Sequence, residues 1–320
     1  MTNPIDHAPK SNRLASEVEP GIFLLDHHFR GSPGVIASYL VADGDALTLI
    51  ETGPASTMET LLAGVRQAGF DPEQIGDIVV THIHLDHAGG AGALLRRLPR
   101  ARLHVHPVGA PHLIDPAKLM ASATRIYGDL MGPLWGEMLP VPKERLDILG
   151  DEETLVTGGR TLRAYDTPGH ANHHLALHEP DTGAVFTGDV AGVRLDGIRH
   201  VRPPTPPPEF SPEKWQASIA TLLSLKPRRL YLTHFGGYDD VDWHLNELLA
   251  RTWFWAGWVG GRLATGEEPP LIAAALREME DVTLASAASD QSLLVRYEEA
   301  GNYRMSVDGI ARWWRKRGES

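Results

Sequence analysis

The chain has 320 residues, of which 42% are hydrophobic and 22% charged. This composition is ordinary for a globular protein of one large or two small domains. Asp and Glu (41) outnumber Lys and Arg (30), and the formal charge of −11 argues against a broad nucleic-acid or anionic-membrane interface. The chain has 16 histidines and no cysteine. Disulfide scaffolds, thiol nucleophiles and thiolate metal sites are therefore excluded, and any metal must bind imidazole and carboxylate.

The compartment is predicted from what the chain lacks. Its first residues contain no apolar run typical of a cleaved signal. No stretch approaches the roughly 18 to 20 apolar residues that cross a bilayer. We therefore expect a cytoplasmic protein that acts on a small-molecule substrate without nucleic-acid or membrane partners, and a homodimer is left open.

Strand and helix patterns alternate along the chain, which predicts an α/β fold. The first half is expected to contain two or three strands in 21–50 with a hairpin at 43–45, a helix over 55–69, a strand over 77–80, a helix through 94–98 and a strand over 102–105. A partly helical stretch over 107–140 and a strand over 161–166 follow, and then a hairpin of 174–178 and 184–188. The last part is expected to contain an extended proline connector over 203–208, a helix over 212–225, a strand over 229–232 and helices after 240. The predicted organisation is an N-terminal arm (1–20), a catalytic domain (21–239) and a helical C-terminal extension (240–320).

The strongest motif is Thr81-His-Ile-His-Leu-Asp-His87, which directly follows a buried strand. Loops at the carboxyl ends of strands are where α/β proteins usually form their sites. Its four candidate ligands, His82, His84, Asp86 and His87, are too many for one metal to collect without strain. The spacing therefore favours two metals that share the loop.

Three further segments also place a ligand-type residue at the end of a strand. They are Tyr165-Asp-Thr-Pro-Gly-His170, Val185-Phe-Thr-Gly-Asp189 and Leu230-Tyr-Leu-Thr-His234. Each is weak alone, because a lone histidine after a strand is more often structural than a ligand. Together, each supplies what the first loop lacks.

These four motifs, in this order and spacing, resemble the metallo-β-lactamase superfamily over residues 20–240. The resemblance implies a four-layer αβ/βα sandwich with a dinuclear site at one edge of the paired sheets. It implies one metal on His82, His84 and His170, a second on Asp86, His87 and His234, and Asp189 bridging both. The expected cofactors are two divalent ions, with zinc first and iron or manganese as alternatives.

Two such ions would lower the pKa of bound water toward roughly 7, so that a bridging hydroxide could attack a carbonyl group at neutral pH. We predict that Asp86 passes a proton to the leaving group. Glu51 stands where this superfamily usually has aspartate, in Leu49-Ile-Glu-Thr-Gly-Pro54. The longer side chain is expected to change how the metal ligands are oriented.

Two departures from the sequence motifs of known branches indicate which branch of the superfamily the chain resembles less closely. The chain resembles thioesterases of the glyoxalase II type and lactonases, but His234 is followed by Phe-Gly-Gly instead of a HEYT-like segment. Glutathione thioesters are therefore in doubt as substrates. Asp189 is followed by Val-Ala-Gly-Val, which lacks the tyrosine that many lactonases of this kind place there.

Other residues are assigned to the surroundings of the metals. The stretch 107–140 is interpreted either as a lid or as a surface helix pair, with Tyr127 as a catalytic oxyanion or substrate contact. We interpret the segment that contains Arg194, His200 and Arg202 either as a solvated loop or as a site that binds a substrate carboxylate. His174 is expected to be a hydrogen-bonded structural residue. The tryptophan-rich tail is predicted to form core, a subunit interface or an acyl pocket.

The prediction is a dinuclear metal-dependent hydrolase of a small-molecule ester-like bond, with lactone or carboxylic ester first and thioester second. One alternative is an oxidoreductase with a single iron, like the persulfide dioxygenases of the same superfamily. The other is a non-enzymatic binding protein that retains its metals. The intact Asp86 and Asp189 argue against this last interpretation, because a protein without catalysis would not need both.

Overall fold

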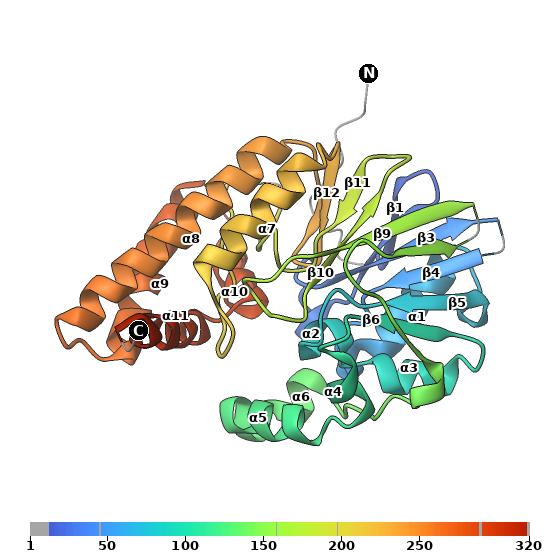
Figure 1. Cartoon of the computed structure of the whole chain (residues 1–320), viewed down its shortest axis with the longest axis horizontal. Coiled ribbons are helices and arrows are strands. Elements are labelled where there is room, and N and C mark those ends of the chain that lie inside the picture. Colours follow the sequence, from blue (N-terminus) through green and yellow to red (C-terminus); the bar gives the residue numbers. More distant parts are fainter. Residues whose placement is uncertain (1–12, 45, 158, 197, 288–289, 319–320) are drawn as a thin grey trace.

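Two β-sheets pack face to face and helices cover both outer faces, as Figure 1 shows. The computed structural model describes residues 13–44, 46–157, 159–196, 198–287 and 290–318. The seven-stranded sheet has the order β1-β2-β3-β4-β5-β6-β7, and the six-stranded sheet has the order β13-β12-β11-β10-β9-β8. The predicted four-layer α/β arrangement is confirmed.

The first sheet starts antiparallel and becomes parallel from β4 onward. Its strands are β1 (Ala15–Glu19), β2 (Ile22–Asp26), β3 (Ala37–Asp43), β4 (Ala46–Ile50), β5 (Ile75–Val79), β6 (Arg102–Val105) and β7 (Leu146–Ile148). Parallel neighbours need crossovers, and these contain α1 (Met58–Gln67), α2 (Leu85–Ala88), α3 (Ala91–Arg97) and the helices of the stretch 107–140. Strand β1 pairs with β2, although it lies within the segment assigned to an arm.

The second sheet is built on the predicted hairpin. Its strands are β8 (Thr154–Thr157), β9 (Arg160–Asp166), β10 (Leu175–Glu179), β11 (Ala184–Phe186), β12 (Arg229–Leu232) and β13 (Gly236–Tyr238). Strands β7, β8 and β13 were not predicted. Each has only three or four residues, and β13 includes Gly237, where a Cβ atom would lie 2.8 Å from the ring of Tyr231.

Alternation along β11 separates two cores. Ala184 and Phe186 belong to the core between the sheets, whereas Val185 faces the core beneath the helices. The inter-sheet core includes Tyr39, whose ring lies 5.3 Å from that of Phe186 and whose hydroxyl donates to the carbonyl of Leu232 at 2.7 Å. The Tyr39 side chain therefore joins the two sheets near the end of β12.

The C-terminal helices form the outer layer over the second sheet, together with the helix before β12. These helices are α7 (Pro212–Ser224), α8 (Val241–Ala264), α9 (Pro269–Ala287), α10 (Ser292–Ala300) and α11 (Tyr303–Gly318). Trp215 of α7 and Trp255 of α8 are completely buried in this second core. No helix among the described residues is both long and apolar enough to cross a membrane.

The stretch between β6 and β7 contains α4 (Ala110–Ile114), α5 (Ala117–Tyr127) and α6 (Met131–Trp135). They project from the edge of the first sheet, at the bottom of Figure 1, toward the C-terminal helices. The partly helical character expected of 107–140 is confirmed.

Candidate metal centre

All the candidate ligands lie on loops that meet at one edge of the paired sheets. His82 and His84 follow β5, and His84 is the residue before α2. His170 lies in the turn between β9 and β10, Asp189 follows β11, and His234 lies between β12 and β13. Four different strand ends therefore contribute to one place, as the order of motifs indicated.

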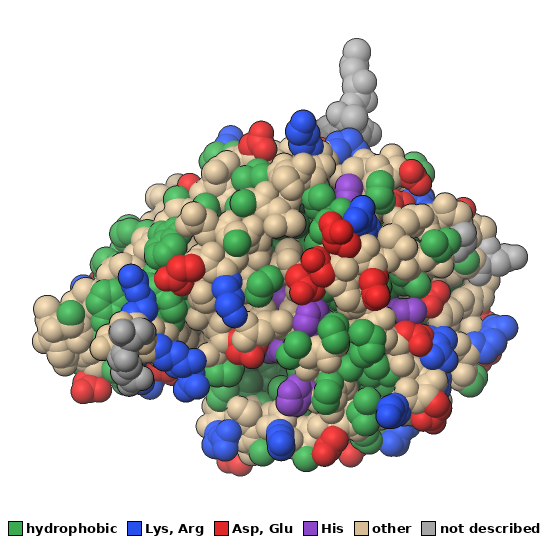
Figure 2. All heavy atoms as spheres, viewed as in Figure 1, with side chains coloured by type: hydrophobic (Ala, Val, Ile, Leu, Met, Phe, Trp, Pro, Cys, Tyr) green, Lys and Arg blue, Asp and Glu red, His purple; other side chains and the backbone are tan. Residues whose placement is uncertain are grey.

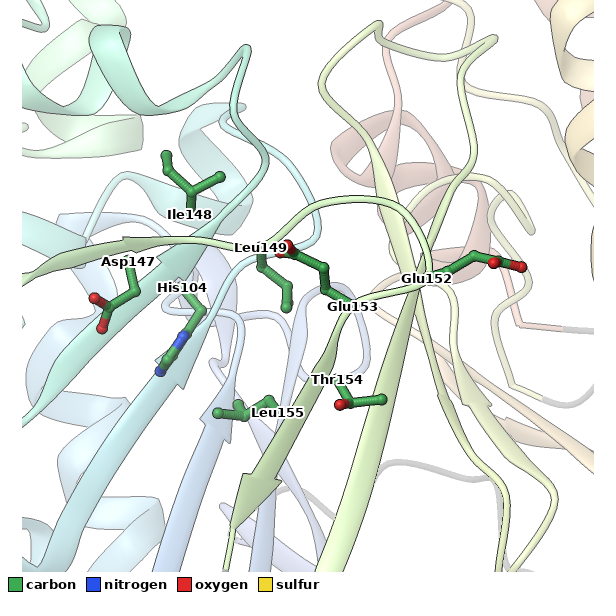
Figure 3. A pocket seen from close by; sticks show the side chains of 8 residues that line it. All are labelled: His104, Asp147, Ile148, Leu149, Glu152, Glu153, Thr154 and Leu155. Carbon is green, nitrogen blue, oxygen red and sulfur yellow. The ribbon is translucent and has the colours of Figure 1, made fainter.

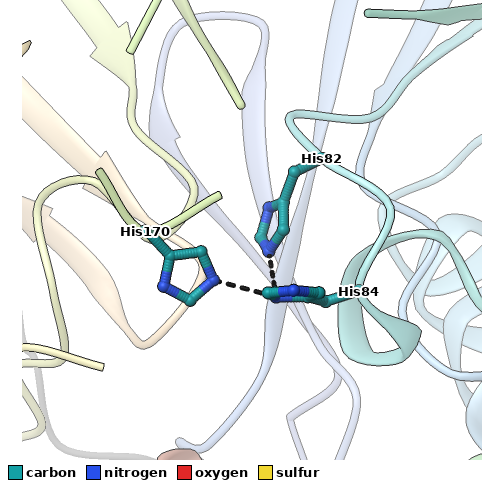
Figure 4. A group of neighbouring side chains, drawn as sticks. All are labelled: His82, His84 and His170. Carbon is teal, nitrogen blue, oxygen red and sulfur yellow. Dashed lines mark hydrogen bonds between the residues drawn. The ribbon is translucent and has the colours of Figure 1, made fainter. Parts of the chain in front are cut away.

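The first group consists of three imidazoles, shown in Figure 4. The Nδ1 atom of His84 lies 2.9 Å from Nε2 of His82 and 2.8 Å from Nε2 of His170. These side chains come from the first loop and from the turn between β9 and β10. Their nitrogen atoms point toward one another and could hold one metal ion.

The second group consists of Asp86, His87 and His234, whose potential ligand atoms all lie within 4.8 Å of one another. Asp189 lies between the two groups. Its Oδ1 atom is 3.2 Å from Nε2 of His87 and 3.5 Å from Nε2 of His234, and its Oδ2 atom is 3.3 Å from Nε2 of His170. The two oxygens of one carboxylate thus face different groups.

Hydrogen bonds on the far side of the rings determine which nitrogen faces the centre. The Nδ1–H group of His170 donates to the carbonyl of Pro204 at 2.9 Å, and that of His234 donates to the carbonyl of Val35 at 2.8 Å. The Nδ1–H of His87 donates to the Glu51 carboxylate at 3.1 Å. Because a neutral imidazole carries one proton, each Nε2 is left with a free lone pair, as a metal ligand requires.

Glu51 binds several groups at once from a left-handed backbone conformation (φ 67°). One oxygen accepts from the Thr81 hydroxyl at 2.5 Å as well as from His87, and the other accepts from the Thr81 backbone N–H at 3.2 Å. The carboxylate is 1% exposed. Glu51 therefore positions His87 and joins the start of the first loop to the end of β4.

Glu51→Gln is expected to weaken metal binding by about 10- to 100-fold, because the amide no longer offers a charged acceptor to His87 and Thr81. The metal dissociation constant, measured by competition with a chromogenic chelator, checks this. Glu59→Gln, at an exposed position of α1, is the matched control. Equal affinity in both variants would show that Glu51 does not orient the ligand.

The charges in the centre suit a cation. Burial raises the pKa of Asp86, but the charges of His87 and His234 outweigh this and bring it down to about 2. Asp189 follows the same pattern, with its pKa well below the ordinary value. Burial, followed by the charges of neighbouring histidines, lowers the pKa of His82. Burial lowers the pKa of His87 and of His234, but the charges of Asp189 and its neighbouring carboxylates outweigh this and raise both. A metal ion would therefore bind a neutral His82 directly and displace a proton from His87 and His234.

Three atoms of the centre are buried without a hydrogen-bond partner among the described residues. They are Nε2 of His87, Oδ1 of Asp189 and Nε2 of His234. Leaving such atoms without partners is costly. A divalent ion between them would satisfy all three, so the residues present fit the implied metal.

Comparisons with known proteins agree with this geometry. The family described as "Metallo-beta-lactamase superfamily" matches residues 31–234. The chain belongs to this superfamily. It is 30% identical to the metallo-beta-lactamase fold-containing protein ST1585 of Sulfurisphaera tokodaii over 224 residues, covering 68% of this chain and 80% of that protein. The solved structure of ST1585 from Sulfolobus tokodaii has a TM-score of 0.57 at 25% identity, over 69% of this chain and 81% of that one.

Two further relatives carry the names of thioester-cleaving enzymes. A hydroxyacylglutathione hydrolase of Cupriavidus taiwanensis is 33% identical over 155 residues, covering 47% of this chain and 47% of that enzyme. An atrochrysone carboxyl ACP thioesterase of Aspergillus fumigatus is 27% identical over 228 residues, covering 69% of this chain and 59% of that enzyme. The chain thus spans about half of the former and less than two thirds of the latter. The superfamily match and the ligand groups together make this edge of the sheets a candidate metal-binding site of a metallo-β-lactamase-fold protein.

Two superfamily motifs contain residues that support the ligands. His174 accepts the backbone N–H of Asp189 at its Nε2 atom (3.1 Å), and its Nδ1–H donates to Thr167 at 2.8 Å. Gly188 has φ 49°, and a Cβ atom there would lie 2.3 Å from the Thr81 hydroxyl. The glycine before Asp189 is therefore required for close approach of the loops.

The other predicted site residues lie at different depths. Tyr127, at the end of α5, is partly buried; its hydroxyl donates to Sδ of Met305 at 3.2 Å, and it belongs to neither ligand group. The interpretation of Arg194, His200 and Arg202 as part of a solvated loop is wrong.

These three side chains are buried, with exposures of 4%, 1% and 1%. The Arg194 guanidinium pairs with Asp240 at 2.6 Å, His200 lies 3.1 Å from Glu280, and Arg202 donates to backbone carbonyls of Tyr297 and Gly301. They connect the loop after Asp189 to the C-terminal helices. The sequence contained no local signal for these partners.

A separate pocket of about 500 Å³ lies near strands β6–β8 and is shown in Figure 3. Its lining residues are His104, Asp147, Ile148, Leu149, Glu152, Glu153, Thr154 and Leu155. His104 pairs with Asp77 at 2.7 Å and Asp147 with Arg102 at 2.5 Å. Since these groups already have partners and none is a metal-centre residue, the pocket does not compete with the metal centre as the site of chemistry.

Proposed function

We propose that this protein uses two divalent ions to hydrolyse an ester-like bond of a small molecule, either a carboxylic ester or lactone, or a thioester. The observation that carries the proposal is the position of Asp189, whose two oxygens face two ligand groups. The names of the two enzyme relatives support testing thioesters first. When bound, the ions would activate water and polarise the carbonyl group of the substrate.

The residues of the chain have distinct tasks in this proposal. His82, His84 and His170 would hold one ion, and Asp86, His87 and His234 the other. Asp189 would bridge the two ions. Asp86 and His84 are the ligand candidates that are partly exposed, and the side chain of Asp86 is 22% exposed. Its Oδ2 atom lies 3.4 Å from Nε2 of His234 and its Oδ1 atom lies 3.9 Å from Nε2 of His87, so Oδ1 is the less closely engaged oxygen and the one that could pass a proton to the leaving group.

Removing the metals is the direct test. We expect about two equivalents of zinc, manganese or mixed metal per chain after anaerobic purification, and loss of thioester or ester hydrolysis on treatment with a chelator. Activity should return when metal is added back. One tightly held iron per chain and no metal-dependent hydrolysis would contradict the proposal and support the oxygen-dependent alternative.

Asp86→Asn is expected to lower kcat by about a hundredfold while leaving substantial metal bound, because the amide cannot carry the proton. Steady-state kinetics combined with metal analysis checks this. Asp115→Asn is a control outside the ligand groups. A near-normal kcat for Asp86→Asn with full metal content would remove Asp86 from proton transfer.

A further inference from the structure

A hollow lies beside the metal centre, between helices α4–α6 and the C-terminal helices. Figure 2 shows it with hydrophobic side chains on its walls and histidines near its inner edge. In Figure 1 the same region separates α5 and α6 from α11. What could occupy this hollow follows from the side chains of the two opposing groups of helices.

The insertion side leaves apolar groups uncovered. Helix α5 has 11 residues, yet only Ala123 is buried. Ile126 is 47% exposed and Leu130 is 58% exposed, while Met131 is partly buried. These residues follow one another closely from the end of α5 to the start of α6, and contiguous exposed apolar surface marks ligand or partner sites.

One contact joins the two sides. The hydroxyl of Tyr127 in α5 donates to Sδ of Met305 in α11 at 3.2 Å. A thioether sulfur is a weak acceptor, so this hydrogen bond is easily exchanged for one to a ligand oxygen. Methionine also adapts its shape to apolar ligands readily.

Behind this contact lies a row of aromatic rings. Tyr127 meets Trp135 edge to face at 5.1 Å, and Trp135 stacks on Phe29 at 5.6 Å. Phe29 and Trp135 are 2% and 8% exposed. The insertion is therefore anchored to the loop after β2 by rings, and this anchor gives the hollow a firm apolar boundary.

The charge of the metal centre acts on Tyr127. Burial, and then the negative charge of Asp86, raise the pKa of Tyr127 well above its ordinary value. Tyr127 is therefore a neutral hydrogen-bond donor close enough to Asp86 to be influenced by its charge.

The two cations that adjoin Met305 and Phe29 in the sequence are already paired. Arg304, next to Met305, pairs with Asp308 at 2.9 Å, and Arg30, next to Phe29, lies 3.3 Å from Glu299. Recognition of a substrate carboxylate would need a free cation. Next to Met305 and Phe29, these pairs instead favour an uncharged group of the substrate.

We propose that the hollow binds the apolar acyl group of the substrate, with Tyr127 and Met305 on opposite sides of its mouth. The inference rests on the proposed function, and it narrows the substrate class to esters or thioesters of uncharged apolar acids longer than acetate. The acyl chain would contact α5, α6 and Met305, and its carbonyl carbon would lie toward the metal centre.

The test is a series of N-acetylcysteamine thioesters with acetyl, butyryl, hexanoyl and octanoyl groups. Each buried methylene should raise kcat/KM by up to about fourfold. Met305→Gln keeps the length of the side chain but makes its end polar, and should flatten this dependence. Tyr127→Phe retains the apolar wall and should preserve the dependence, although kcat falls. Leu271→Gln, at a position 62% exposed in α9, is the matched control and should behave like the unmodified protein.

Binding separates this inference from the proposed function. Octanamide and acetamide, which resist hydrolysis, are titrated into the metal-loaded protein by calorimetry. Tighter binding of octanamide that Met305→Gln weakens supports the acyl site, even if every thioester is left intact and the proposed hydrolysis fails. Hydrolysis that is equal for acetyl and octanoyl groups, with equal affinity for the two amides, overturns the acyl site while the proposed hydrolysis stands.

Discussion

Asp189→Asn is expected to reduce kcat/KM by about a thousandfold or more and to lower the metal content below that of the unmodified protein. The Asp189 oxygens face both ligand groups, so the change removes one negative charge from both at once. Its amide nitrogen would also direct hydrogens toward one of the ions. Replacing residues that merely support ligands costs 10- to 100-fold in affinity or activity, and loss of a shared ligand should cost more.

Metal analysis and steady-state kinetics on the same preparation check this expectation. Asp181→Asn is the matched control, because this aspartate is exposed in the turn between β10 and β11. Circular dichroism would establish that both variants fold. A variant at Asp189 that kept two ions and hydrolysed within tenfold of the normal rate would refute the bridging role.

Trp255→Ala is expected to destabilise the protein by about 4 kcal/mol. This indole is fully buried in the core between the second sheet and the C-terminal helices, and its N–H donates to Glu280 at 3.0 Å. The substitution leaves a cavity and removes a partner from a carboxylate that is 2% exposed. The melting temperature should fall by roughly 10 °C.

Differential scanning calorimetry of Trp255→Ala and Phe254→Ala makes the comparison within one helix. Phe254 is 48% exposed, so its removal should cost less than about 0.5 kcal/mol. Similar melting temperatures for the two variants would mean that α8 does not help to hold the second sheet. A large difference would show that the C-terminal helices are part of the same core.

The residues that meet at the candidate metal centre could be proposed from the sequence because they lie in short loops, or in the first turn of a helix, that follow strands readable from a few neighbouring letters. The strand before His82 is a short buried run, and those before Asp189 and His234 are similar. Since strand ends meet at an edge of a sheet, local patterns sufficed to bring distant ligands together. Short strands such as β13, with its two glycines, offered no such pattern.

The supporting contacts were harder to foresee because their partners are far apart in the chain. Arg202 reaches carbonyl groups around residues 297–301, and no periodicity marks a carbonyl as an acceptor. For this arginine we expected either a solvated loop or a carboxylate site instead. Glu51 was recognised as a variant acid, but its bonds to Thr81 became evident only from the geometry of the two strand ends.

The position of the Arg202 acceptors has a consequence for protein synthesis. Every ligand of the metal centre, up to His234, is translated before Tyr297 and Gly301. A chain that stops between these points carries the full ligand set, yet its Arg202 lacks the carbonyl groups that accept from its Nη2 atom in the complete fold. An unsatisfied guanidinium cannot be buried without a large cost. Products of premature termination would therefore be substrates for cellular quality control even though their metal motifs are intact.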